Sequence, residues 1–183
     1  MNTTSITIIA VVVTLALVGI ILVLILARRK NSEKLQEKFG SEYDLAVETQ
    51  GDEKKAQAEL KERQKHVDAL DIRPLSDSER ERYLADWAAV QSKFVDEPGQ
   101  AIVDADHLIM EVMQLRAYPV ADFEQRAADL SVNYPALVSN YRAARVIALK
   151  NEQQQADTEE LRQAMIYYRS LFEELLAIEA VGV

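Results

Sequence analysis

The chain of 183 residues carries 30 acidic and 21 basic residues, a formal net charge of −9 at pH 7, and no cysteine. This length suits one globular domain with appendages. Without cysteine, the chain has no disulfide framework, cysteine-ligated zinc site, thiol nucleophile or iron–sulfur cluster.

After a short polar tail at residues 1–5, residues 6–27 form an apolar run without a charged residue, ITIIAVVVTLALVGIILVLILA. A helix needs about 20 such residues to cross a bilayer core. A cleaved signal peptide would have basic residues before the run, whereas the tail is MNTTS and the basic residues follow in LARRK. The sequence therefore predicts an uncleaved transmembrane helix at 6–27, which anchors the chain in the lipid bilayer.

Arg28, Arg29 and Lys30 flank this helix on one side, and no basic side chain precedes it. Basic residues beside a membrane span tend to remain in the cytoplasm. We therefore expect a single-pass protein of the cell membrane, with the N-terminus outside and the rest of the chain in the cytoplasm. The alternative is a domain outside the cytoplasm. The three basic residues also suit a contact with anionic lipid.

Beyond Lys30 the formal charge of the chain is −12, because three basic residues precede the first acidic residue, Glu33. Such a charge repels nucleic acid. We therefore expect no nucleic-acid partner, and another protein as partner in addition to the bilayer. No pattern assigns an oligomeric state.

Residues 28–70 are expected to form a basic juxtamembrane segment and a helical stalk. Between residues 31 and 70 the basic side chains are six Lys and one Arg, whereas residues 71–183 contain nine Arg and two Lys. Lysine suits a solvated stalk, and the planar guanidinium of arginine suits fixed, partly buried ion pairs. This shift predicts that an acidic all-α domain occupies residues 71–183.

Two glycines divide the stalk, since Gly40 and Gly51 each suit the end of a helix. Apolar residues in the stalk fit a heptad seam, but Arg63 occupies one of its core positions. The seam is also shorter than the three or four heptads typical of a coiled coil. We therefore do not expect the stalk to form a coiled coil.

The arginine-rich domain is expected to be an irregular bundle of about five helices with short connections. Ser76 and Glu79 form a predicted capping box at the start of the first helix. A second, broadly apolar helix begins near Pro98 and is the expected centre of the bundle. The last two helices are expected to begin at N-caps on Asn133 and Asp157.

The third helix of the domain lies in DFEQRAADLSVNYP, whose crowded charges could belong to a catalytic site. Asp122 is expected to cap the helix, with Gln125 at the third position. Arg126 is expected to pair with Asp129, three residues later. The alternative role for Asp122 is an ion pair with Arg126, four residues later. These residues are assigned a structural role. A buried Arg126 without a charged partner would reopen that interpretation.

Asp104, His107 and Glu111 share one face of the second helix and are the candidates for a metal site. Di-iron bundles need further ligands from other helices, and the other histidine, His66, lies in the stalk. We therefore assign no catalytic residue, metal or cofactor, and expect an interaction or scaffold module rather than an enzyme. The alternative is a metal-binding or hydrolytic domain built on carboxylates and histidine.

The aromatic side chains allow two interpretations. Exposed beside arginine, they would form a protein-binding hot spot. Buried, they would fill the core with their polar atoms at its edge. The residues concerned are Tyr43, Tyr83, Trp87, Tyr118, Tyr134, Tyr141, Tyr167 and Tyr168.

Five segments cover nearly all of the chain after Lys30: EKFGSEYDLAVETQGD, IRPLS, RYLADWAAVQSKFVDEP, ADHLIMEVMQLRAYPVADFEQRAADLSVNYP and TEELRQAMIYYRSLFEELL. Together they resemble a family of uncharacterised bacterial proteins, often described as secreted or membrane proteins. The resemblance implies an anchored helical protein and no known activity. Three residues depart from the pattern of that family: Ala117 stands in place of a glycine, and Tyr134 and Tyr167 stand in place of histidines.

Overall fold

The computed structural model describes residues 19, 20, 22, 30 and 32–177. These residues form helices, turns and loops without a strand, which confirms the all-α class. Most of the predicted transmembrane helix at 6–27, together with Arg28 and Arg29, lies outside the described residues, and Lys30 is helical and exposed. Within the described part, no helix combines the length and the apolar character needed to cross a membrane. The anchor therefore stays a prediction.

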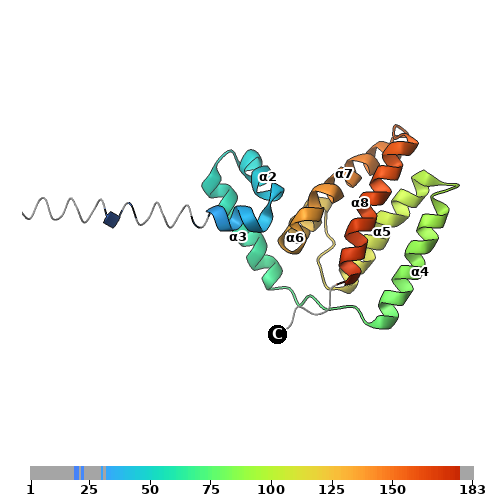
Figure 1. Ribbon diagram of the computed structural model, residues 1–183, viewed down its shortest axis with the longest axis horizontal. Coiled ribbons are helices and arrows are strands. Elements are labelled where there is room, and N and C mark those ends of the chain that lie inside the picture. The colour runs from blue at the N-terminus through green and yellow to red at the C-terminus, as the bar shows by residue number, and fades with distance from the viewer. Residues whose placement is uncertain (1–18, 21, 23–29, 31, 178–183) are drawn as a thin grey trace, which may run out of the picture. The chain divides into compact units, whose positions relative to one another are not determined.

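Contacts divide the chain into two compact units, Met1–Lys38 and Phe39–Val183. In the first unit, residues 32–38 are helical. The second unit contains the helices labelled in Figure 1, which are α2 (Ser41–Gln50), α3 (Glu53–Asp68), α4 (Asp77–Lys93), α5 (Pro98–Leu115), α6 (Phe123–Asn133), α7 (Pro135–Glu152) and α8 (Thr158–Ala177).

The structure corrects the domain boundary predicted at Asp71. Helices α2 and α3, expected to form a solvated stalk, belong to the same compact unit as the five helices that follow. Helix α3 packs against α6, and α2 packs against α7. The apolar seam of α3 is buried, while its four lysines are exposed. The lysine-rich composition therefore marks the solvated face of α3 and not a separate stalk.

The five helices after Asp71 confirm the predicted bundle, and their order in space differs from their order in the chain. Neighbours in space are α6 with α7, α7 with α8, α8 with α5, and α5 with α4 (Figure 1). Helix α8 thus lies between α7 and α5. Helix α5, the expected central helix, packs against α4, α7 and α8 and buries eight of its residues.

The aromatic residues join the helices in the core. The rings of Trp87 on α4 and Phe172 on α8 stack with centroids 4.6 Å apart, and Tyr141 on α7 meets Tyr168 on α8 edge to face at 6.1 Å. Of the aromatic residues considered for a binding surface, seven are buried and Tyr167 is partly buried. The hot-spot interpretation is therefore wrong, and core filling is confirmed, although the Trp87 Nε1 is buried without a hydrogen-bond partner among the described residues instead of lying at the edge of the core.

Two of the predicted N-caps on the bundle helices are confirmed by hydrogen bonds. The Ser76 hydroxyl accepts from the Glu79 backbone N–H at 3.3 Å, and the Glu79 carboxylate accepts from the Ser76 backbone N–H at 2.8 Å. The Asp157 carboxylate accepts from the Glu160 N–H at 2.8 Å. Each bond satisfies a backbone donor that has no partner inside its helix.

The N-cap predicted at Asn133 is wrong. Asn133 is the last residue of α6, and Tyr134 caps α7 without a side-chain hydrogen bond. The amide of Asn133 instead donates to the Tyr118 hydroxyl at 2.7 Å. The single residue between α6 and α7 leaves no room for a separate cap, because Pro135 already begins α7.

Ala117, which follows α5, has a φ of 67°. This left-handed conformation costs a residue with a Cβ roughly 1–2 kcal/mol and suits glycine. The turn also directs Tyr118 into the core, where it is buried.

Candidate functional site

Five alternating charges join four helices around the buried carboxylate of Glu42 on α2. Glu42 is 2% exposed and lies 3.4 Å from Arg63 Nη1 on α3 and 3.1 Å from Arg142 Nε on α7. Arg63 also pairs with Glu59, and Arg142 lies 2.5 Å from Glu124 on α6. We call these five residues the ion-pair network. Its centre is buried, so it fixes how α2 and α3 dock on the bundle.

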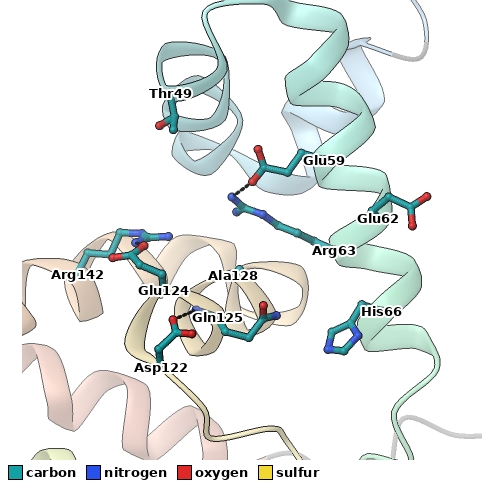
Figure 2. A pocket seen from close by; sticks show the side chains of 10 residues that line it. All are labelled: Thr49, Glu59, Glu62, Arg63, His66, Asp122, Glu124, Gln125, Ala128 and Arg142. Atoms are coloured by element: carbon teal, nitrogen blue, oxygen red, sulfur yellow. Dashed lines mark hydrogen bonds and ion pairs between the residues drawn. The ribbon is translucent and has the colours of Figure 1, made fainter.

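A cavity of about 550 Å³ opens beside this network between α3 and α6 (Figure 2). Figure 2 shows Arg63 and His66 of α3 pointing toward α6, and Gln125 of α6 pointing toward α3. We call this cavity the charged cleft. Its lining residues are Thr49, Glu59, Glu62, Arg63, His66, Asp122, Glu124, Gln125, Ala128 and Arg142.

His66 and Asp129 face each other at the edge of the charged cleft. His66 Nε2 lies 3.6 Å from Asp129 Oδ1, which also accepts a hydrogen bond from Gln125 Nε2 at 2.8 Å. Asp129 is fully buried, and its Oδ2 has no hydrogen-bond partner among the described residues. Burial raises the pKa of the Asp129 carboxyl above its usual range. This contact joins α3 to α6.

The side chains of the charged cleft are engaged with one another. Glu59 and Glu124 pair with the arginines of the ion-pair network, and Asp122 caps α6 by accepting from the Gln125 N–H at 2.9 Å. That cap was predicted. Histidine beside a buried carboxylate is the arrangement of a general base and its orienting group. Such a pair activates a nucleophile, and Thr49 is the one lining residue that carries a hydroxyl. The arrangement therefore favours a structural interface over catalysis.

We expect Asp129→Asn to raise the free energy of unfolding at pH 7. The folded-state pKa of Asp129 is raised, so the ionised carboxylate at pH 7 opposes folding. As the pH falls through the folded-state pKa, the native state binds a proton before the unfolded state does, and the wild type gains stability. The advantage of the variant should therefore shrink and vanish below about pH 4, the usual pKa of an aspartate.

Urea unfolding of both proteins at pH 7, 5.5 and 4 measures this difference. Asp122→Asn is a matched control, because the amide oxygen of asparagine can still cap α6. A lower stability of Asp129→Asn at pH 7 would show that the charge of Asp129 stabilises the fold through His66.

A second cavity, of about 650 Å³, adjoins the charged cleft and has a more apolar lining. Three of its side chains are exposed hydrophobics: Leu45 on α2, and Val146 and Leu149 on α7. We call this cavity the apolar groove. Its lining residues are Leu45, Ala46, Thr49, Arg63, Phe123, Glu124, Arg142, Arg145, Val146 and Leu149. Four of them also line the charged cleft, so the two cavities adjoin each other.

The metal-site candidates do not converge with ligands from another helix. Asp104 lies 2.7 Å from Lys93 Nζ and accepts from Gln100 at 2.9 Å. The hydrogen bond from Lys93 holds the pKa of Asp104 below its usual range. His107 and Glu111 are exposed. In the part of the chain that the structure describes, no group of three or more histidine and acidic residues has the arrangement of a metal site.

Arg126 is buried and does not form the ion pair predicted with Asp129. Its Nε donates to the Tyr141 hydroxyl at 3.3 Å, and its Nη1 donates to the Ala121 carbonyl at 3.4 Å. Its guanidinium also lies 5.8 Å from the Phe123 ring centroid. On α6 the two predicted partners diverge, since Arg126 turns toward α7 and Asp129 toward α3. Arg126 supports Phe123, which lines the apolar groove.

Comparisons of the chain with protein-family models, with curated proteins and with solved structures find no match. The resemblance to a family of uncharacterised bacterial proteins therefore stays a prediction. Function is inferred from the cavities and their side chains.

Proposed function

We propose that the protein is a membrane-anchored helical interaction module whose apolar groove binds a segment of another protein. The anchor in this proposal is the predicted transmembrane helix at 6–27, with Arg28, Arg29 and Lys30 on the cytoplasmic side. The observation that carries the proposal is the set of exposed apolar side chains in a groove, next to arginines that are already held in place.

The groove has the composition of a protein-binding site rather than of ordinary surface. Val146 is 56% exposed and lies one helical turn from Leu149, and Leu45 of α2 is exposed in the same groove. Exposed apolar side chains scattered singly are common, but those gathered in one concave site are typical of docking surfaces. A helix with apolar residues on one face fits such a groove.

The fixed arginines suggest the charge of the bound segment. Arg145 on α7 lines the groove, and its guanidinium lies 5.8 Å from the ring centroid of Phe123. Its recorded partner, Glu152, is 3.6 Å away and mostly exposed. A carboxylate on the bound protein segment could replace the weak surface contact between Arg145 and Glu152. The proposed partner therefore has an apolar face with an acidic residue beside it.

The alternative function, a metal-binding or hydrolytic domain, has less support. It requires Asp104, His107 and Glu111 to meet acidic ligands from another helix, and Asp104 is instead paired with Lys93. The carboxylates of the charged cleft are likewise paired with arginine or used as a helix cap.

A photoreactive residue at position 146 should crosslink to a partner protein in native membranes. The substitution Leu149→Asp places a charge in the groove and should lower the crosslinked yield about tenfold, as expected when a central apolar contact of an interface is lost.

Leu84 on α4 is the matched control, because it is 50% exposed and does not line the groove. A photoreactive residue at position 84 should give no such product, and Leu84→Asp should leave the yield from position 146 unchanged. Equal crosslinking from both positions, or a yield insensitive to Leu149→Asp, would rule out the groove as the binding site.

A further inference from the structure

A third cavity, of about 470 Å³, lies beside the connection between α3 and α4 and the end of α5. Its lining residues are Val67, Asp68, Leu70, Asp71, Ile72, Pro74, Arg116, Tyr118, Asn133 and Tyr134. We call it the Arg116 pocket. It shares no lining residue with the apolar groove. Ligand binding in this pocket can therefore be tested independently of the proposed interaction module.

Arg116 is 3% exposed and makes hydrogen bonds to neutral oxygens. Its Nε donates to the Arg73 carbonyl at 3.2 Å, and its Nη1 donates to the Tyr134 hydroxyl at 3.0 Å and to the Leu175 carbonyl at 2.8 Å. These bonds hold the guanidinium in one position. Among the described residues, no carboxylate lies within 4.0 Å of it.

The charge of Arg116 is therefore buried without a counter-ion in the described part of the chain. A guanidinium has five N–H donors, and the recorded bonds use the one on Nε and the two on Nη1. Within residues 32–177, the donors on Nη2 have no acceptor. Burying a charge without a partner is costly, and an anion in the adjacent pocket would remove that cost.

The Tyr118 hydroxyl supplies a further donor beside Arg116. The Tyr134 hydroxyl accepts from Arg116, and the Tyr118 hydroxyl accepts from Asn133 at 2.7 Å. A phenol that accepts one hydrogen bond keeps its own proton to donate. Burial, together with a hydrogen bond to the Tyr118 hydroxyl, raises the pKa of Tyr134 well above its usual value. The Tyr134 proton is therefore directed to Tyr118, and the Tyr118 proton remains for a ligand. One end of the pocket is thus rich in donors.

The other side of the pocket limits the kind of anion that fits. Val67, Leu70, Ile72 and Pro74 give it an apolar wall. Asp68 and Asp71 line the pocket and are exposed, so they repel a ligand of high negative charge such as phosphate. The combination favours a single negative charge attached to an apolar body.

The geometry points to a binding site for a monoanionic carboxylate with a short apolar body, held by Arg116 and by the hydroxyl of Tyr118. A guanidinium and a hydroxyl match the acceptor oxygens of a carboxylate. The same chemistry is present in a free carboxylic acid and in the C-terminal residue of a peptide, and the experiment separates these two sources.

Isothermal titration of the full-length chain with 4-methylpentanoate should show saturable binding. The neutral 4-methylpentanamide and inorganic phosphate should bind at least about tenfold more weakly, because each lacks either the charge or the apolar body. A tripeptide that ends in leucine with a free carboxylate tests whether the ligand is a peptide C-terminus. The same tripeptide with an amidated C-terminus is its control. Tighter binding of the tripeptide than of the free acid assigns the site to a chain terminus, and the reverse assigns it to a small acid.

Two variants test the site without removing Arg116, whose loss would also release the Leu175 carbonyl. Tyr118→Phe should weaken binding of 4-methylpentanoate about five- to tenfold, because one charge-assisted hydrogen bond is lost. Asp71→Asn should strengthen it about two- to threefold, because a repelling charge at the pocket is removed. Tyr83→Phe, a buried tyrosine of α4 outside the pocket, is the control and should change neither value.

Absence of saturable binding by the wild type, or equal binding of acid and amide, would overturn the proposal. The proposal would also be overturned if the Tyr118→Phe and Asp71→Asn variants both bound 4-methylpentanoate as the wild type does. That result is expected if Arg116 has a purely structural role.

Discussion

Glu42→Ala is expected to lower the free energy of unfolding by about 3 kcal/mol, the low end of the range for a buried ion pair that loses one partner. Glu42 is the shared acceptor for Arg63 and Arg142. Its removal leaves two partly buried guanidinium groups facing each other. The loss stays near the low end because both arginines are partly exposed, with 17% and 20% of their side chains accessible.

Urea unfolding of the full-length chain, followed by circular dichroism, measures this loss. Glu173→Ala is the control, because Glu173 pairs with Arg169 on α8 and both side chains are more than half exposed. Such a surface pair contributes at most about 1 kcal/mol. If the two variants lost equal stability, the ion-pair network would not be what holds α2 and α3 on the bundle.

Phe172→Ala is expected to lower the free energy of unfolding by about 3–5 kcal/mol, the range for truncating a fully buried phenylalanine. Phe172 has no exposed surface and stacks on the Trp87 ring. Alanine would leave a cavity between α8 and α4 and would remove the stacking contact.

The chain contains one tryptophan, so the emission of Trp87 reports on this cavity directly and should shift to longer wavelength as water enters. Ile166→Ala is the matched control on the same helix, because Ile166 is 41% exposed. It should change stability by no more than about 0.5 kcal/mol. A small loss for Phe172→Ala with unchanged emission would mean that α8 does not pack on α4 through this ring.

The helices of the bundle could be predicted because their signals are local. The Ser76 and Glu79 capping box, the proline at the start of α5 and the aspartate that caps α6 each act within one helical turn. The broad apolar face of α5 likewise predicted its burial, although α8 and not α5 lies in the middle of the five helices. The prediction at Asn133 failed because α6 continues through Asn133 and a single residue separates it from α7.

The sites could not be predicted in the same way, because they depend on contacts between distant residues. Glu42 and Arg142 are 100 positions apart, and Arg116 and Leu175 are 59 apart. Composition placed a boundary at Asp71, although the apolar seam of α3 packs inside the same unit. One signal was present: Arg63 in the core position of that seam indicated a buried charge and hence a partner elsewhere in the chain.

The place of α8 between α7 and α5 has a consequence for biosynthesis. Helix α5 is complete long before its main neighbour α8 leaves the ribosome, and synthesis of the intervening residues takes on the order of several seconds at typical rates. During that time the face of α5 that packs against α8 is without its partner. Truncations that remove the C-terminal helix should therefore leave an aggregation-prone remainder rather than a smaller folded bundle.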